Sequence, residues 1–475
     1  MAVTILDCYT DEPAGLGVPP YLGTYPRYIA GSLEETPYYI TIDDLRNYYK
    51  PKKSMQKTNI KTYNLTKNKN IKEIIQKTSE LIIIAGVHTP GKYLSAVPGT
   101  LREIINLIKE FNCSKILAGP AVFGTSTKGG GFFERTDLKQ FDEIKDFNFS
   151  YDEINPVKGS EIIKQIPDLR IIEIESSKGC SRAKGCSFCT EPIKGKLTFR
   201  DNNDIIKEIK AFYDKGVYYF RLGKQSCFYS LPEPVELLKT IRKQFPKIKV
   251  LHIDNVNPAN TLSKRGIEIT KSVVRYCTEG NIASFGVESF DKEVYSANNL
   301  NCSPDDAVKA VKSINKYGAE KGDNGMPKYL PGINLLFGLI NESKQTHEAN
   351  MEYLTKILDN YLVRRINIRQ VNIFEGTHLF NTAGNKFIKK NKKYYWKWRN
   401  EIRQKIDYPM LKKLVPEGTV LKNIRTEVHD GKTTFGRQIG TYPLIVGIKQ
   451  RLELNKFYDV KVRGHMLRSI VCTIL

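Results

Sequence analysis

Strand-like and helix-like stretches alternate six times between residues 165 and 375, which is the signature of a parallel α/β architecture. The predicted strands are 169–175, 217–223, 248–254, 282–287, 332–338 and 366–373. The amphipathic segments between them are 202–214, 233–245, 267–278, 304–318 and 344–361. By analogy with parallel barrels, we expect functional side chains at the carboxyl ends of these strands.

Residues 1–150 form a separate α/β unit in the pattern. Its short apolar strands are 3–6, 81–85 and 115–118, each followed by a turn rich in Gly and Pro. Such loops at the carboxyl edge of a parallel sheet form a crevice where ligands commonly sit.

After residue 376 the strand and helix rhythm stops. Residues 385–414 are predicted to form a basic helical connector, and residues 420–475 short strands separated by Gly turns. We therefore expect three domains, with bounds 1–150, 151–376 and 377–475.

The formal charge of +23 on 475 residues indicates a polyanionic partner such as RNA, DNA or an acidic surface. Much of the excess lies in Lys50–Lys77 and in Lys386–Lys413, where it is interleaved with Tyr394, Tyr395, Trp396 and Trp398. Basic groups neutralise phosphates and aromatic faces can stack on bases. The alternatives are a general abundance of Lys on solvated faces and an aromatic stripe that packs inside the protein.

Nine cysteines without a secretory leader indicate a reducing compartment, so we expect a cytoplasmic protein. No stretch approaches the roughly eighteen apolar residues that span a bilayer, so no membrane association is expected.

Three cysteines, Cys180, Cys186 and Cys189, fall within ten residues just after the strand at 169–175. Three thiolates suit a [4Fe-4S] cluster whose fourth iron stays open for a small molecule. A structural zinc ion is the alternative, but it requires four protein ligands. No histidine or further cysteine lies between residues 160 and 220.

This run resembles the cluster motif of radical S-adenosylmethionine (SAM) enzymes. Their usual spacing is C-x3-C-x2-C; here the first gap is C-x5-C, whereas the second, with Phe188 before the last cysteine, fits. The resemblance implies a partial (βα)6 barrel at 151–376, with a [4Fe-4S] cluster and SAM as cofactors. In such enzymes the open iron chelates SAM, and one electron from a ferredoxin- or flavodoxin-type donor cleaves it to a 5′-deoxyadenosyl radical.

The same resemblance implies SAM-binding residues at the strand ends. Gly223 and Gln225 stand where the superfamily holds the SAM ammonium, although the usual acid is replaced by Gln. Glu288, with Ser289 beside it, resembles the residue that bonds the ribose hydroxyls; capping the next helix is its alternative role. Gly338 is expected to allow close approach to the adenine.

The sixth strand places Asn367 and Arg369 on one face. If that face lines the barrel, Arg369 could pair with a substrate carboxylate or phosphate. The alternative is that Arg369 pairs with a buried acid of the protein.

The first 150 residues resemble the Rossmann-like, cobalamin-binding-like domain that precedes many radical SAM cores. The D-x-H-x-x-G segment that supplies a histidine to cobalt is absent, and the setting of His88 does not match it. Cobalamin is therefore a doubtful cofactor. Methylthiotransferases bring three cysteines to a second cluster in this region, whereas only Cys8 and Cys113 fall here.

The last domain resembles the TRAM or OB-like β-barrel modules of RNA-modifying radical SAM enzymes. Most of the chain also resembles archaeal radical SAM proteins of unassigned substrate, through the Asp11–Pro20 opening and the tail that ends at Pro443. We therefore expect a radical SAM enzyme that modifies RNA, with tRNA favoured. The alternatives are modification of a small molecule or protein, including cobalamin-assisted methylation, and a non-catalytic iron-sulfur or RNA-binding protein.

Overall fold

The computed structural model describes residues 2–13, 15–49, 62–89, 91, 94, 96–126, 133–135, 138–182 and 184–475. Residues 50–61 of the first predicted basic stretch, Lys50–Lys77, therefore lie outside the described residues. The chain divides into an N-terminal unit, Met1–Glu175 with Arg200–Tyr218, and a C-terminal unit, Ser176–Phe199 with Tyr219–Leu475. The predicted division into three domains stays a prediction.

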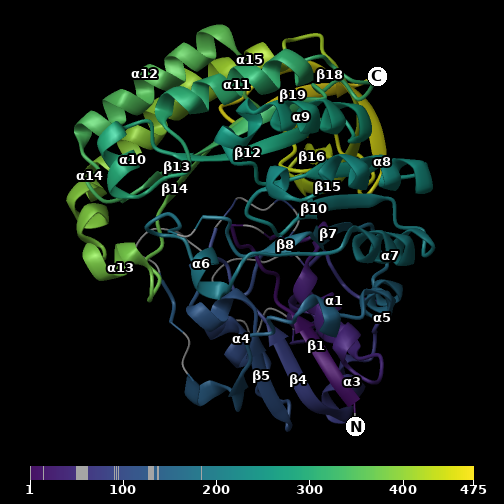
Figure 1. Cartoon of the computed structure of the whole chain (residues 1–475). Coiled ribbons are helices and arrows are strands. Elements are labelled where there is room, and N and C mark those ends of the chain that lie inside the picture. The colour runs from purple at the N-terminus through teal and green to yellow at the C-terminus, as the bar shows by residue number, and fades with distance from the viewer. Residues whose placement is uncertain are drawn as a thin grey trace. The chain divides into compact units, whose positions relative to one another are not determined.

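The N-terminal unit contains a five-stranded parallel sheet (Figure 1). The sequence pattern predicted its three central strands, β1 (Ala2–Asp7), β4 (Thr78–Ile84) and β5 (Ser114–Ala118). The strands β3 (Tyr38–Thr41) and β6 (Glu143–Ile144) extend its two edges in the order β3-β1-β4-β5-β6. Separately, β2 (Tyr21–Leu22) pairs with β7 (Ile171–Glu175), which confirms the strand predicted at 169–175.

Three helices share a hydrophobic core with this sheet: α2 (Ile42–Tyr49), α3 (Ile71–Lys77) and α4 (Leu101–Leu107). Their buried aliphatic residues pack on Leu6, Leu81 and Leu117 of the central strands. The remaining helices of this unit are α1 (Thr24–Ser32), α5 (Pro156–Gly159) and α7 (Asn202–Tyr213).

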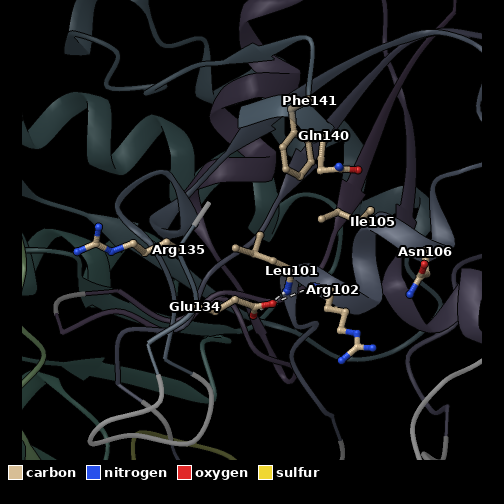
Figure 2. Close-up of a pocket in the computed structure, with 8 residues that line it drawn as sticks. All are labelled: Leu101, Arg102, Ile105, Asn106, Glu134, Arg135, Gln140 and Phe141. Carbon is tan, nitrogen blue, oxygen red and sulfur yellow. Dashed lines mark hydrogen bonds between the residues drawn. The ribbon is translucent and has the colours of Figure 1, made fainter. Parts of the chain in front are cut away.

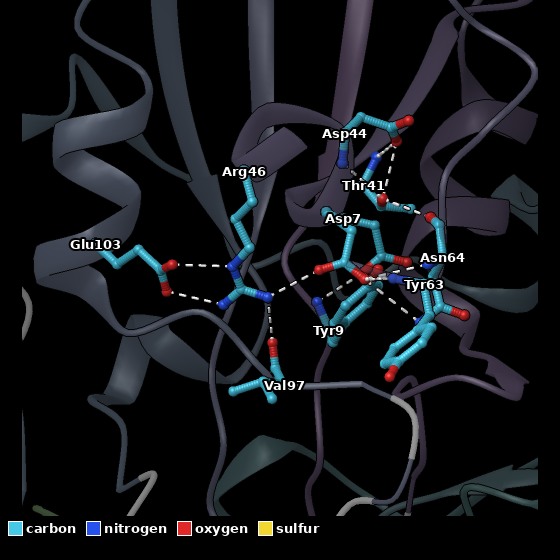
Figure 3. Close-up of polar contacts among 10 residues, drawn as sticks. Asp7, Tyr9, Thr41, Asp44, Arg46, Tyr63, Asn64, Val97 and Glu103 are labelled. Atoms are coloured by element: carbon cyan, nitrogen blue, oxygen red, sulfur yellow. Dashed lines mark hydrogen bonds and ion pairs between the residues drawn. The ribbon is translucent and has the colours of Figure 1, made fainter. Parts of the chain in front are cut away.

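A buried arginine connects two of these helices (Figure 3). Arg46 of α2 donates two hydrogen bonds to the carboxylate of Glu103 on α4, at 2.9 and 2.8 Å, and a third to Asp43 Oδ1 at 3.0 Å. It also donates to the Val97 carbonyl at 2.7 Å. Because Arg46, Asp43 and Glu103 are largely shielded from water, the network is strong only while every partner is present.

In the C-terminal unit, five strands and four helices confirm the predicted alternation. The strands are β10 (Tyr219–Gly223), β11 (Val250–Ile253), β12 (Asn281–Glu288), β13 (Tyr329–Phe337) and β14 (Arg365–Gln370). The helices are α8 (Pro234–Gln244), α9 (Lys264–Tyr276), α11 (Pro304–Gly318) and α12 (Lys344–Asn360). The strand β10 runs parallel to β11, and β12, β13 and β14 form a parallel sheet.

A helical segment follows β14, as the sequence predicted. It consists of α13 (His378–Thr382), α14 (Lys386–Ile402), a π-helical turn (Arg403–Asp407) and α15 (Tyr408–Leu414). None of the helices among the described residues combines the length and apolarity needed to cross a membrane.

The chain ends in a closed five-stranded barrel, which confirms the β module expected after residue 420. Its strands are β15 (Val420–Asp430), β16 (Thr433–Gln438), β17 (Ile445–Ile448), β18 (Phe457–His465) and β19 (Ser469–Ile474). Its core is continuous with Met326 and Leu330, beside and within β13, and with Leu411 of α15. The barrel is therefore packed on the α/β part of its unit.

The loop between β16 and β17 reaches the strands of the α/β part. Burial lowers the pKa of His252, on β11, to about 4, and its neutral Nδ1 accepts a hydrogen bond from the Thr441 N–H at 2.9 Å. Arg364 donates to the Tyr442 carbonyl at 2.5 Å, and the guanidinium carbon of Arg365 lies 4.1 Å from the centre of the Tyr442 ring. The loop thus fastens the barrel to β11 and β14.

Changing Arg46 to alanine should destabilise the N-terminal unit by about 3–5 kcal/mol, because Glu103 and Asp43 would be left buried without their cation. Hydrogen exchange of the β4 amides measures this loss locally. Both tryptophans of the chain lie in α14, so fluorescence monitors the C-terminal unit separately. The exposed Arg102→Ala on α4 is the control, and an equal effect of both changes would contradict the prediction.

Candidate functional site

The three cysteines lie on one loop of the C-terminal unit. It runs from β8 (Ser177–Lys178) to α6 (Glu191–Lys194), and β8 pairs with β9 (Thr198–Phe199). All three thiols are free and partly buried. The Cys189 N–H donates to the Cys186 carbonyl at 3.0 Å, which makes a tight turn between the last two cysteines.

Two asparagines after α10 (Lys292–Ala297) hold this loop in place. The Asn298 carbonyl accepts the Ser187 N–H at 2.9 Å, and its Oδ1 accepts the Ser187 hydroxyl at 2.6 Å. Asn299 donates to the carbonyls of Lys184 and Gly185, at 2.5 and 3.0 Å. The sequence analysis missed both anchors; the only signal was an Asn pair, a residue type that tolerates the left-handed φ of 48° found at Asn299.

Arg182 supplies positive charge to the thiols. Its Nη1 lies 3.2 Å from Cys186 Sγ, and its backbone N–H lies 3.4 Å from Cys180 Sγ. Burial raises the pKa of Cys186 to about 11, against the lowering effect of Arg182, and burial also raises the pKa of Cys189. Because thiolates are the ligands of a metal centre, binding of a cluster would release these protons.

The donor set fits an iron-sulfur cluster. The charges of Cys180 and Cys186 both act on Cys189, so the three sulfurs share one neighbourhood. Among the described residues, no three His, Cys, Asp or Glu side chains lie close enough to hold a single metal ion. Phe188 packs beside Cys186 against Leu339, Val371 and Leu379, which gives the loop an apolar wall.

Glu288 is the last residue of β12, at a bulge where it pairs with Leu335. Its φ of 62° is rare for a residue with a side chain and turns the carboxylate out of the strand. A Cβ on Gly286 would lie 3.0 Å from Glu288 Oε1 and 3.3 Å from Asn301 Nδ2, so this glycine leaves room for both groups. Burial raises the pKa of Glu288 to about 8, partly offset by Arg369.

Gly223 ends β10 and Gln225 follows two residues later. The Gln225 Oε1 accepts the Ser176 hydroxyl at 3.2 Å, and its Nε2 donates to the Leu222 carbonyl at 3.1 Å. The carboxamide is therefore oriented by the protein, with one oxygen lone pair left to accept another hydrogen bond. A SAM contact here stays a prediction.

Ser289 and Gly338 have contacts within the protein. The Ser289 hydroxyl accepts the Asp291 N–H at 3.1 Å, which caps the turn into α10. Gly338 has a φ of 96°, and a Cβ there would lie 2.5 Å from Ile388 Cγ1 on α14. Its N–H donates to Glu342 Oε2 at 2.7 Å. Gly338 thus allows α14 to pack closely, and its predicted approach to adenine stays a prediction.

The comparisons with known proteins identify this arrangement. The model of the radical SAM superfamily matches residues 174–354, which include the three cysteines and Glu288. An uncharacterised protein of Methanocaldococcus jannaschii is 41% identical over 98% of this chain and 92% of its own length. The chain belongs to the radical SAM superfamily.

Two further matches cover the radical SAM protein to different extents. The radical SAM methyltransferase TsrM from Kitasatospora setae, solved with tryptophan and a SAM analogue, shares the fold with a TM-score of 0.51 and 13% identity, over 90% of this chain and 79% of its own. A tRNA-2-methylthio-N(6)-dimethylallyladenosine synthase of Lachnoclostridium phytofermentans is 25% identical over 38% of this chain and 38% of its own length.

Membership of the superfamily implies a [4Fe-4S] cluster and SAM as cofactors. When bound, they would supply the radical chemistry of the superfamily. Cys180, Cys186 and Cys189 would hold the cluster. Arg182 would lower the negative charge beside Cys186, and Phe188 with its apolar neighbours would exclude water from that side.

Cobalamin fits the described residues only without a histidine ligand. His88 lies at the carboxyl edge of the N-terminal sheet, but it is buried, and its Nε2 lies 2.8 Å from the Pro120 carbonyl and 2.9 Å from the Gly124 carbonyl. Its backbone N–H donates to the Asp11 carbonyl at 2.7 Å. The His88 ring therefore holds the Pro120–Gly124 loop through its Nε2.

A separate pocket of about 390 Å³ lies beside α4 in the N-terminal unit (Figure 2). The Glu134 carboxylate accepts the N–H groups of Leu101 and Arg102, at 3.1 and 2.9 Å. Because this side chain already occupies the positive end of the helix, the pocket offers no anion site there.

Changing Cys180, Cys186 and Cys189 together to alanine should abolish the cluster, because these are the thiols of the loop. Iron and sulfide content, and the 5′-deoxyadenosine formed with dithionite and SAM, should fall to background. Cys302→Ala is the control, since this buried thiol lies near enough to Cys186 for their charges to interact but follows α10. A full cluster in the triple variant, or a lost one in the control, would contradict the assignment.

Protein produced with cobalamin available should contain no histidine-ligated cobalt. Electron paramagnetic resonance of the Co(II) form measures this directly, because a nitrogen ligand splits the cobalt signal. Stoichiometric His-ligated cobalamin would show that the interpretation of His88 is wrong.

Proposed function

We propose that this protein is a cytoplasmic radical SAM enzyme that modifies RNA, with tRNA as the first substrate to test. The observation that carries the proposal is the exposed face of α14. The partial match to a tRNA-modifying enzyme, over 38% of this chain, supports the same substrate class.

The exposed face of α14 is strongly basic. Its exposed lysines are Lys386, Lys389, Lys390, Lys392, Lys393 and Lys397. Trp396 lies among them with 62% of its surface exposed, and the Arg399 guanidinium carbon lies 5.1 Å from its ring centre. The single acid of the helix, Glu401, is bonded to Lys405 and His347. Lysines that neutralise phosphates beside an aromatic face that stacks on a base suit single-stranded RNA.

The other aromatic residues of α14 serve packing. Trp398 is buried and stacks on His347 of α12, with 5.3 Å between the ring centres. Tyr394 stacks on Trp398, with 5.4 Å between the ring centres. Tyr395 contacts Phe337 of β13 edge to face. Packing therefore accounts for Tyr394, Tyr395 and Trp398, and the exposed Trp396 is available to stack on a base.

Modification of a small molecule or protein, including cobalamin-assisted methylation, is the second candidate. The fold likeness to TsrM, whose structure holds tryptophan, favours it. In either case Glu288 would orient SAM, and a ferredoxin- or flavodoxin-type protein would deliver the electron.

Changing Lys389, Lys390, Lys392 and Lys393 to glutamine should weaken tRNA binding and flatten its salt dependence. Each lost phosphate contact removes about 0.7–0.9 from the magnitude of the slope of log K against log salt, so the magnitude should fall by up to about 3.6 for four lost contacts. Filter binding or fluorescence anisotropy at several salt concentrations measures the slope.

The control variant changes Lys239, Lys243, Lys247 and Lys249, which are equally exposed in and after α8. Cleavage of SAM without RNA should be the same in both variants, since these lysines are remote in sequence from the cysteine loop. Equal salt slopes in the two variants would overturn the RNA proposal and leave the second candidate.

A further inference from the structure

The strand β14 presents a polar face. Arg365, Asn367 and Arg369 alternate with Ile366 and Ile368; the isoleucines are buried, and the three polar residues are partly exposed. Parallel pairing sets Asn367 opposite Asn334, and Arg369 opposite Leu336, on β13. The polar face therefore continues from β14 onto its neighbour.

The amides of this face bond to one another. Asn367 Nδ2 donates to Asn334 Oδ1 at 3.1 Å, and Asn334 Nδ2 donates to the Ser284 hydroxyl on β12 at 3.3 Å. This chain of hydrogen bonds crosses all three strands and fixes both amides. Neither Arg365 nor Arg369 contributes a hydrogen bond to this chain.

The charge of Arg369 acts on Glu288, but among the described residues no acid lies close enough to pair with it directly. Its Nε is buried without a hydrogen-bond partner, and it forms no ion pair with a described acid. Arg365 lies four residues before Arg369 on the same face of β14, and its guanidinium stacks on the Tyr442 ring. Burial lowers the pKa of Arg365, and the neighbouring Arg369 and Arg403 lower it further, although Asp407 pairs with Arg403. A partly buried guanidinium that no carboxylate bonds directly is stabilised when an anion completes it.

Arg369 also lies near the cysteine loop. Cys186 and Phe188 of that loop pack against the hydrophobic cluster that contains Val371, two residues after Arg369. A group bound by Arg369 would therefore be held within reach of the chemistry that the cysteine loop supports.

We propose that Arg369, beside the fixed amides of Asn367 and Asn334, binds an oxyanion of the substrate, a phosphate or a carboxylate. The planar guanidinium can donate two parallel hydrogen bonds to either group, which orients the substrate as well as binding it. The inference deepens the proposed function, since it requires that a substrate be processed beside the cysteine loop. The other source of the same chemistry is the carboxylate of SAM itself.

Inorganic phosphate is the probe for this site. The reconstituted full-length protein, with the four α14 lysines changed to glutamine so that surface binding is reduced, is titrated with phosphate by calorimetry at constant ionic strength. Arg369→Gln should weaken phosphate binding by about tenfold or more. Arg369→Lys should lose less, because it keeps the charge but not the planar fork. Arg463→Gln, an exposed arginine on β18, should change nothing.

Equilibrium dialysis with SAM separates the two sources. SAM affinity should stay within about threefold in Arg369→Gln. A loss of SAM affinity as large as the loss of phosphate affinity would assign Arg369 to SAM and overturn the proposal. Absence of phosphate binding in the parent protein, or unchanged binding in both Arg369 variants, would also overturn it. The tRNA-binding test of the α14 lysines is a separate measurement. Failure of the RNA proposal and failure of the Arg369 proposal can therefore be told apart.

Discussion

The register of three parallel strands, β12, β13 and β14, is the constraint on which the candidate site depends. It places Glu288 opposite Leu335 and Arg369 opposite Leu336, so the carboxylate and the guanidinium reach the same end of the sheet. Because side chains alternate with a period of two, a slip of one residue would exchange Arg369 for Ile368. The buried isoleucines of β14 therefore position the polar face indirectly, because a shift by one residue would expose them to the polar side.

The cysteine loop has little regular structure of its own and takes its position from elements outside it. Asn298 and Asn299 supply hydrogen bonds to its backbone, and Asn298 also donates to the Ile340 carbonyl at 2.9 Å beyond β13. The loop is thus aligned with the ends of β12 and β13. A metal-binding loop that is anchored through its backbone can keep all three thiols available as ligands.

Much of the architecture could be predicted from the sequence because buried parallel strands are short apolar runs that contrast with amphipathic helices. The pattern missed β3 and β6, which contain four and two residues and so carry too little periodicity. The cysteines and Glu288 were visible as local motifs. Arg182 and Asn298 were not, since their roles arise from contacts that only the tertiary fold creates. Gly338 was assigned to a cofactor, and only the structure showed Ile388 over it.

The loop that carries Thr441 and Tyr442 has a consequence for how this protein can evolve. His252 accepts a hydrogen bond from this loop, while Arg364 bonds a carbonyl of the loop and Arg365 lies over its Tyr442 ring. The barrel therefore completes the interior of the part that precedes it, unlike an appendage joined by a linker. Exchange of this barrel for another accessory module would leave a buried imidazole and two arginines unmatched. The two parts should accordingly be inherited together, with compensating changes on both sides of the loop.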